Sequence, residues 1–240
     1  MLDLNDLIIK KVHFDNEFYL SCDFKIPREM SSFSAKRKSE FCAGRMAAIS
    51  AANELGISLK QIPKGEKGEP LWEEPIVGSI THSHGTAIAA IGLTAKYKSI
   101  GIDIEKKIDK SRTATLDKMV LTRKDKEYLK QLPDSKKLTF YQICFTAKEA
   151  FYKLIYPLAK EYFDFREASL VEIDFDKGTL VIELHSERQG LSNYLRHYTG
   201  YFQIQDNSCF VLFYLTSSDK TVNYSYENNR EGSINLYTRR

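Results

Sequence analysis

Gly101-Ile102-Asp103-Ile104-Glu105 alternates two branched apolar side chains with two carboxylates. Successive side chains of a β-strand point to opposite faces, so the isoleucines are expected on one face and Asp103 and Glu105 on the other. The two acidic residues would then have Cα atoms roughly 6.5 to 7 Å apart. Both carboxylates can reach one ion from there, and oxygen ligands of this kind suit Mg²⁺. The alternative interpretation is an edge strand with one solvent-exposed face, which shows the same alternation.

A second informative stretch is Phe145-Thr146-Ala147-Lys148-Glu149-Ala150-Phe151-Tyr152-Lys153. Apolar residues recur around it at helical spacing and predict a helix over residues 139–156 that stops before Pro157. The opposite face of this helix would carry Lys148, Glu149 and Lys153. A solvated face with a Glu149–Lys153 pair is the alternative interpretation.

The third stretch is Gly78-Ser79-Ile80-Thr81-His82-Ser83-His84-Gly85, which an apolar run at 87–93 follows. It predicts a strand, a tight polar turn and a returning strand. At the end of the first strand, His82 and Ser83 are able to hydrogen-bond phosphate oxygens. A histidine next to a turn is also commonly structural, so this stretch alone decides little.

In this order, the three stretches resemble the signature of the 4'-phosphopantetheinyl transferases of the Sfp superfamily. Two further blocks, at 36–45 and 68–72, match the same pattern. The chain is most similar to the branch that serves bacterial siderophore synthetases, such as the enterobactin synthetase component D. The resemblance runs from about residue 33 to about residue 155.

The resemblance implies an enzyme that moves the phosphopantetheine arm of coenzyme A onto a serine of an acidic apo carrier protein. It implies that Mg²⁺ is bound by Asp103, Glu105 and Glu149, and that Glu149, directly or through a metal-bound water, is the base for the serine. Lys148 and Lys153 are implied to neutralise the pyrophosphate. A siderophore peptide synthetase is the implied partner; polyketide and fatty-acid carriers remain open.

The resemblance also implies which residues bind coenzyme A. In the helix expected after Ser34, Arg37 and Arg45 would lie about 12 Å apart along the axis and about 80° apart around it. Their long side chains can converge from there on the 3'-phosphate, although Arg37 also fits a plain surface charge. The full set of implied contacts is Arg37, Arg45, Lys64, Lys67, His82, Ser83 and, through the metal, Asp103.

The pattern of helices and turns predicts an α+β fold. The resemblance adds two pseudo-symmetric halves, each a helix packed on antiparallel strands, with the active site in the cleft between them. We place the halves at 1–108 and 109–240, with the catalytic helix at 139–156 and a polar tail after 217. Strands are expected at 169–175, 179–185, 198–205 and 209–216.

Composition limits the function classes. The 240 residues are 42% hydrophobic, which suffices for a proper core, and the net charge of +3 is too small to argue for nucleic acid. No apolar run approaches the roughly 18 residues of a membrane span. Four cysteines without metal or disulfide spacing suggest free thiols in a reducing cytoplasm. Relatives of this length tend to be monomers.

Two other functions remain to be compared. A catalytically inactive coenzyme A binder would be expected to lack Asp103, Glu149 or Lys153, and all three are present. A nucleic-acid-binding module would concentrate its charge around Lys36 to Arg45 and bind in a strongly salt-dependent way. Stabilisation by coenzyme A with Mg²⁺, and not by nucleic acid, discriminates between them.

Overall fold

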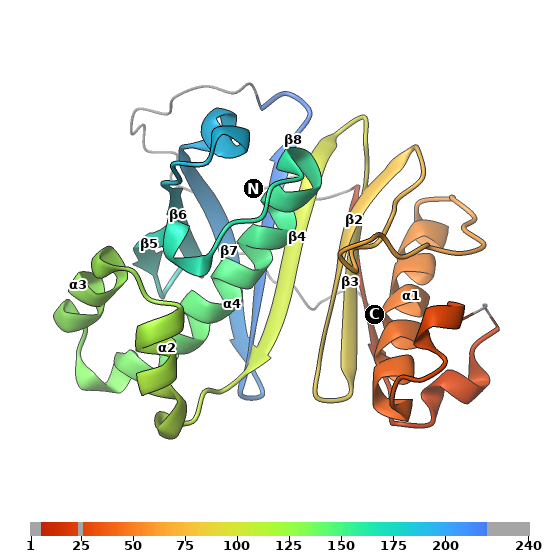
Figure 1. The fold of residues 1–240 in the computed structure, drawn as a ribbon, viewed down its shortest axis with the longest axis horizontal. Helices are drawn as coiled ribbons and strands as arrows, with labels where there is room; N and C mark the ends of the chain where they lie inside the picture. Colours follow the sequence, from red (N-terminus) through yellow and green to blue (C-terminus); the bar gives the residue numbers. More distant parts are fainter. Residues whose placement is uncertain (1–5, 24–25, 220–240) are drawn as a thin grey trace. The chain divides into compact units, whose positions relative to one another are not determined.

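The computed structural model describes residues 6–23 and 26–219 and has the predicted α+β architecture. The chain forms two compact units, one ending at Ile100 and one beginning at Gly101 (Figure 1). No helix within the described ranges is long and apolar enough to span a membrane. Each unit is built from helices packed on an antiparallel sheet, and each is described by itself below.

The first unit contains a three-stranded antiparallel sheet. Its strands are β1 (Leu7–His13), β2 (Ile76–Ser83) and β3 (Thr86–Leu93), in the order β1-β3-β2. A two-residue turn joins β2 to β3, with His84 and Gly85 both at positive φ, which is the favoured geometry of a tight hairpin. The predicted strand, turn and returning strand are therefore confirmed.

Helix α1 (Ala35–Glu54) covers this sheet. The Ser34 hydroxyl caps its first turn by accepting the Arg37 backbone N–H, and Gly56 follows its end at a φ of +77°. The start of the helix was predicted from Ser34. The helix buries a stripe of small residues against the sheet, and the resulting core comprises Ala47, Ala48, Ala51, Ala52, Ile62, Ile76, Ala89 and Ile91. Two short 3₁₀ turns, Phe18–Ser21 and Arg28–Met30, precede the helix.

The second unit contains a five-stranded antiparallel sheet in the order β4-β8-β7-β6-β5. Its strands are β4 (Tyr97–Lys106), β5 (Ala168–Asp174), β6 (Thr179–Leu184), β7 (His197–Gln205) and β8 (Ser208–Thr216). The last four match the predicted strands to within a residue at each end. Helix α4 (Asp134–Ala159) runs along one face of this sheet (Figure 1).

Two shorter helices stand before α4 in the second unit. Helix α2 (Thr113–Met119) packs on α4, and helix α3 (Arg123–Gln131) packs on β5. Thr122 and Asp125 cap α3 reciprocally, as their spacing predicts. Short 3₁₀ turns occur at Lys110–Arg112, Phe165–Glu167 and Gln189–Tyr194.

Two boundaries differ from the expectations. The boundary between the two units falls between Ile100 and Gly101, inside β4, and not at residue 108. The catalytic helix is longer than 139–156 and continues through Pro157, against the expected stop. Proline removes one hydrogen bond, but only Leu158 and Ala159 follow it in the helix, and both are partly buried against the core. The expected polar tail lies mostly outside the described residues.

Candidate functional site

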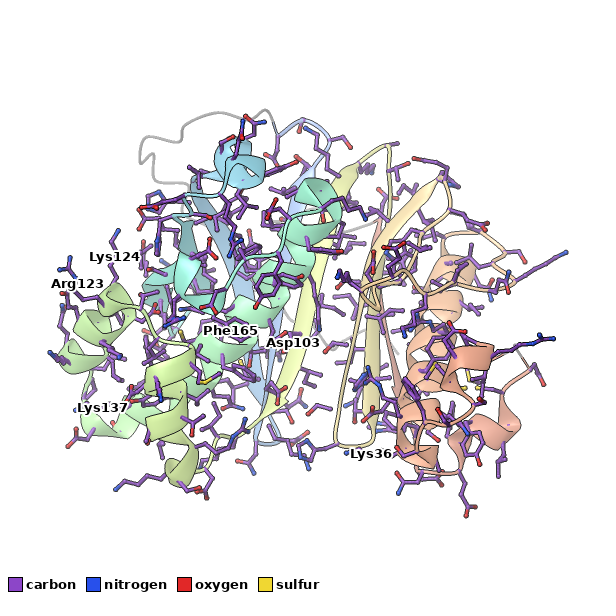
Figure 2. The ribbon with its side chains drawn as sticks, viewed as in Figure 1. Lys36, Asp103, Arg123, Lys124, Lys137 and Phe165 are labelled. Carbon is purple, nitrogen blue, oxygen red and sulfur yellow. The ribbon has the colours of Figure 1, made fainter. Side chains whose placement is uncertain are left out.

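Strand β4 supplies two of the three predicted carboxylates. Ile102 and Ile104 pack into the core, and Asp103 and Glu105 point to the other face, as the alternation predicts. Only 5% of the surface of Asp103 is exposed, so the acidic face of β4 is not open to solvent at this residue. Figure 2 shows Asp103 on β4, next to helix α4. A buried carboxylate needs a charged or hydrogen-bonding partner.

Gly101 lets the acidic strand approach helix α4 closely. A Cβ at this position would lie 2.1 Å from the Ala150 carbonyl oxygen and 2.6 Å from the Leu154 backbone nitrogen. Both atoms belong to the helix backbone and cannot give way. The glycine that opens the Gly-Ile-Asp-Ile-Glu motif therefore sets the distance between the strand and helix α4.

Helix α4 supplies the third carboxylate and a cation. Glu149 and Lys153 lie one turn apart on the helix, and the Lys153 Nζ is 2.7 Å from Asp103 Oδ1. This ion pair joins the helix to the strand, and both of its members are residues that the motifs single out. The lysine side chain is 29% exposed, whereas Asp103 is nearly inaccessible. The pair therefore offers its cationic end to a ligand arriving from solvent.

The pKa values show that the three carboxylates influence one another. Burial, with the negative charges of Asp103 and Glu149, raises the pKa of Glu105 to about 7. Burial also raises the pKa of Glu149, while nearby Lys153 lowers it and Asp103 raises it. Glu105 and Glu149 thus keep their protons at higher pH than an exposed carboxyl does. The reason is that they are partly buried and lie close to other carboxylates.

The donor set of this cluster fits Mg²⁺. Carboxylate oxygens are its preferred protein ligands, and a divalent cation would relieve the repulsion that raises the pKa of Glu105. Within residues 6–23 and 26–219, no three acidic, histidine or cysteine side chains already converge as a closed metal centre. The residues present suit a metal that keeps several waters and shares its ligands with a substrate.

Lys148 does not lie on the polar face where it was expected. Its side chain is 1% exposed, and its Nζ donates to Asp125 Oδ2 at 2.5 Å and to the Val120 carbonyl at 2.8 Å. The reason is geometric, because consecutive helical residues are turned by about 100°. With Glu149 facing β4, Lys148 faces α3 instead. The expectation that Lys148 faces the phosphates is therefore wrong for this structure.

Asp125 is the partner that the sequence did not reveal. It is fully buried, and its carboxylate also accepts the backbone N–H groups of Thr122 and Leu170, each at 2.7 Å. One carboxylate thus joins α3, α4 and β5. The capping-box spacing was the available signal, but it predicted a helix cap and gave no hint of the buried ion pair.

The first unit holds the residues implied for coenzyme A. Arg37 Nη1 lies 3.2 Å from His82 Nε2 and donates to Glu40 Oε2 at 3.1 Å. His82 Nδ1 is 3.8 Å from the other oxygen of the same glutamate. Helix α1 and strand β2 therefore bring Arg37 and His82 together, as the resemblance implies. Glu40 was missed, although its position three residues after Arg37 was a signal.

Arg45 is the most unusual side chain of this unit. It is 7% exposed, it stacks on Phe41 with 3.9 Å between the guanidinium carbon and the ring centre, and its Nε bonds only weakly to the Ile62 carbonyl at 3.4 Å. The buried Nη2 has no hydrogen-bond partner among the described residues. Burial and the nearby charge of Arg37 lower the pKa of Arg45 to about 10. A buried donor without a partner is rare and suggests a ligand position.

The remaining implied contacts lie in loops of the same unit. The Lys64 Nζ stands 5.8 Å from the ring centre of Phe33, and the Lys67 backbone N–H donates to the Glu69 carboxylate at 3.0 Å. Ser83 Oγ lies 2.9 Å from His84 Nδ1 at the hairpin turn. The structure thus groups Arg37, Arg45 and His82, and it gives Lys64, Lys67 and Ser83 local partners.

Comparison with known proteins identifies the family. Residues 27–92 match the 4'-phosphopantetheinyl transferase N-terminal domain, and residues 99–206 match the 4'-phosphopantetheinyl transferase superfamily. The candidate carboxylates, Asp103 among them, and Lys153 lie in the second match, and the other residues implied for coenzyme A lie in the first. The chain belongs to the 4'-phosphopantetheinyl transferase superfamily.

Curated relatives agree with this family. The chain is 37% identical to the 4'-phosphopantetheinyl transferase PptT of Mycobacterium tuberculosis over 136 residues, which are 57% of this chain and 59% of that protein. It is 37% identical to the transferase Npt of Nocardia iowensis over 56% of this chain and 59% of that one. Enterobactin synthase component D of Escherichia coli O157:H7 is 38% identical over 49% of this chain and 54% of its own. The matches thus span between one half and three fifths of these relatives.

Proposed function

We propose that this protein transfers the 4'-phosphopantetheine arm of coenzyme A to a serine hydroxyl of an apo carrier protein. The observation that carries the proposal is the cluster of Asp103, Glu105 and Glu149 with Lys153, built from the two family motifs in one unit. Phosphoryl transfer requires positioning and neutralisation of charge more than covalent help from the protein. This cluster supplies groups for both.

The reaction breaks the phosphoanhydride bond of coenzyme A and forms a phosphoester with the serine. The serine oxygen forms a bond to the β-phosphorus of coenzyme A, and the bond from that phosphorus to the bridging oxygen breaks. Adenosine 3',5'-bisphosphate leaves with that oxygen. The serine proton passes to Glu149, because burial raises the pKa of this carboxylate and makes it a stronger base than an exposed one.

Each residue has a proposed part. Asp103, Glu105 and Glu149 would hold Mg²⁺, which supplies charge neutralisation at the pyrophosphate when it is bound. Lys153 stabilises the leaving phosphate from its place beside Asp103. In the other unit, Arg45 and Arg37 bind the 3'-phosphate of coenzyme A, and His82 orients Arg37. Lys64, Lys67 and Ser83 are proposed as additional phosphate contacts.

The proposed partner is the carrier domain of a siderophore peptide synthetase in the cytoplasm. The enterobactin synthase relatives support this choice. Polyketide and fatty-acid carriers are the alternative, since other similar proteins are named only as phosphopantetheinyl transferases. The protein is proposed to act as a monomer.

The test is direct transfer to a purified carrier. Apo forms of a peptidyl carrier domain and of an acyl carrier protein are incubated with the protein, coenzyme A and Mg²⁺, and their intact masses are measured. We expect a gain of one phosphopantetheine group that requires both coenzyme A and the metal. Faster loading of the peptidyl carrier would favour the siderophore assignment. An unmodified mass for every carrier would overturn the proposed function.

A further inference from the structure

Gln142 lies on the catalytic helix, two turns before Glu149, and its side chain is almost fully buried. Its Nε2 donates to two backbone carbonyl oxygens, that of Glu105 at 3.0 Å and that of Asn207 at 3.3 Å. One amide group therefore uses both of its protons on main-chain atoms from two other segments. The Glu105 carbonyl belongs to the acidic strand itself.

The second acceptor stands at the turn between β7 and β8. Asp206 and Asn207 form that turn with φ of 49° and 61°, the geometry of a tight two-residue hairpin. The Asn207 carbonyl also accepts the backbone N–H of Lys107 at 2.6 Å. A single carbonyl thus receives one donor from the segment just after β4 and another from helix α4.

The helix geometry connects this contact to the acidic cluster. Seven residues are close to two full turns, so Gln142 and Glu149 project from the same side of α4. That side faces β4, where Glu105 and Asp103 stand. Gln142 binds strand β4 at the backbone carbonyl of Glu105. Glu149 lies near the same strand, two turns further along helix α4. The two contacts together fix how far the end of β4 lies from the helix.

We propose that Gln142 is a positioning residue for the acidic cluster: by binding the backbone of Glu105 and the β7–β8 turn, it fixes the orientation of the Glu105 carboxylate toward a divalent cation. This inference rests on the proposed function, because it assumes that the cluster binds such a cation. Residues that orient metal ligands without binding the metal themselves typically contribute 10-fold to 100-fold in metal affinity or activity.

The test measures metal binding without any turnover. Mn²⁺, which takes the same oxygen ligands, is titrated into the metal-free protein and its free concentration is followed by electron paramagnetic resonance. Gln142→Met keeps the length of the side chain and removes both donors. We expect it to weaken Mn²⁺ binding by about 10-fold to 100-fold, and to raise the Mg²⁺ concentration needed for transfer while most of the rate returns at saturating Mg²⁺.

A neighbouring residue provides the matched control. Tyr141→Phe removes one side-chain hydrogen bond, that to Asp117 at 2.8 Å, from the same helix without touching β4. It should bind Mn²⁺ as the wild-type protein does, even if its melting temperature falls. If Gln142→Met does not fold, Gln142→Asn keeps the amide but cannot reach both carbonyls, and the same weakening is expected.

The outcomes separate this inference from the proposed function. If wild-type protein binds Mn²⁺ and modifies a carrier while Gln142→Met binds the ion equally well, Gln142 only supports the fold and the inference is wrong. If wild-type protein binds no Mn²⁺, the metal role of the cluster fails and the inference fails with it.

Discussion

Glu105 makes the stability of the metal-free protein depend on pH. Its carboxyl has an ordinary pKa of 4.5, and burial with two neighbouring carboxylates raises the folded pKa to about 7. Between these values the folded state keeps a proton that the unfolded state has lost, so the stability from this group falls as pH rises and the full penalty is present above about pH 7. A bound cation favours the ionised form and opposes this effect.

The prediction follows from that sign. Without divalent cations, the melting temperature of wild-type protein should fall relative to that of Glu105→Gln as pH is raised from about 5 to about 8. Added Mg²⁺ should narrow the difference, because it should bind more tightly to the protein that keeps all three carboxylates. If the difference in melting temperature between the two proteins stays constant across this pH range, neighbouring negative charges do not raise the pKa of Glu105.

Arg45 is predicted to bind the 3'-phosphate of coenzyme A. Arg45→Met keeps the contact with Phe41 and removes the charged donors. A charge-assisted hydrogen bond contributes about 1.5 to 3 kcal/mol, so affinity for coenzyme A should fall by roughly one to two decades. Affinity for dephospho-coenzyme A, which lacks that phosphate, should change little. Calorimetric titration measures both.

Lys36 serves as the control for this prediction. Lys36→Met removes a positive charge from the same helix, where the lysine is two-thirds exposed and 3.9 Å from Glu40; Figure 2 labels it. It should leave both affinities nearly unchanged, since exposed charges interact weakly through water. Equal losses for the two ligands in Arg45→Met would mean that this arginine does not bind the 3'-phosphate.

At the scale of elements, the Lys148–Asp125 pair holds helix α4 against α3 and β5. Removing one partner of a buried ion pair leaves an uncompensated charge and costs about 3 to 5 kcal/mol. Lys148→Met should therefore lower the free energy of unfolding strongly, as denaturant titration would show. The exposed Lys137–Asp134 pair on the same helix is the comparison, and Lys137→Met should cost at most about 1 kcal/mol. Similar losses in both variants would contradict a structural role for Lys148.

The sequence predicted these elements unevenly. The hairpin at His82, the capped helix after Ser34 and the four C-terminal strands follow from local patterns, and each is confirmed. Lys148 was misplaced because a charged residue beside a glutamate in a helix gives no sign of a buried partner distant in sequence. Gln142 was missed for a related reason: its acceptors are backbone atoms, which leave no trace in residue type.

At the scale of the whole molecule, we expect a basic rim on α2, α3 and the start of α4 to attract an acidic carrier protein. The rim comprises Lys118, Arg123, Lys124, Lys126, Lys130, Lys136 and Lys137. Figure 2 shows Arg123 and Lys124 on the outer side of α3. Lys124 is 53% exposed and pairs with Glu183 at 2.5 Å, whereas Arg123 is 89% exposed and its partner, Glu127 at 3.5 Å, is itself exposed. Arg123 is therefore the sharper site for a test.

Charge reversal in Arg123→Glu should raise the KM for the carrier protein and leave coenzyme A affinity unchanged. Rim charges act on the association rate and on salt dependence more than on chemistry, so the effect should shrink as salt is added. Lys60→Glu, at an exposed lysine of the first unit, is the control. An unchanged carrier KM for Arg123→Glu at low ionic strength would place the docking surface elsewhere.

The central claim is that Asp103, Glu105 and Glu149 form the catalytic centre of a phosphopantetheinyl transferase. Its most direct test is the rate of carrier modification by Asp103→Ala and by Glu149→Ala at low Mg²⁺, with melting temperature measured alongside. Removing either carboxylate relieves repulsion among like charges. Asp103→Ala also breaks the ion pair with Lys153, but that lysine is 29% exposed and can be hydrated, so folding should be preserved. We predict no detectable holo carrier from either folded variant, and near-normal turnover by one of them would contradict the account.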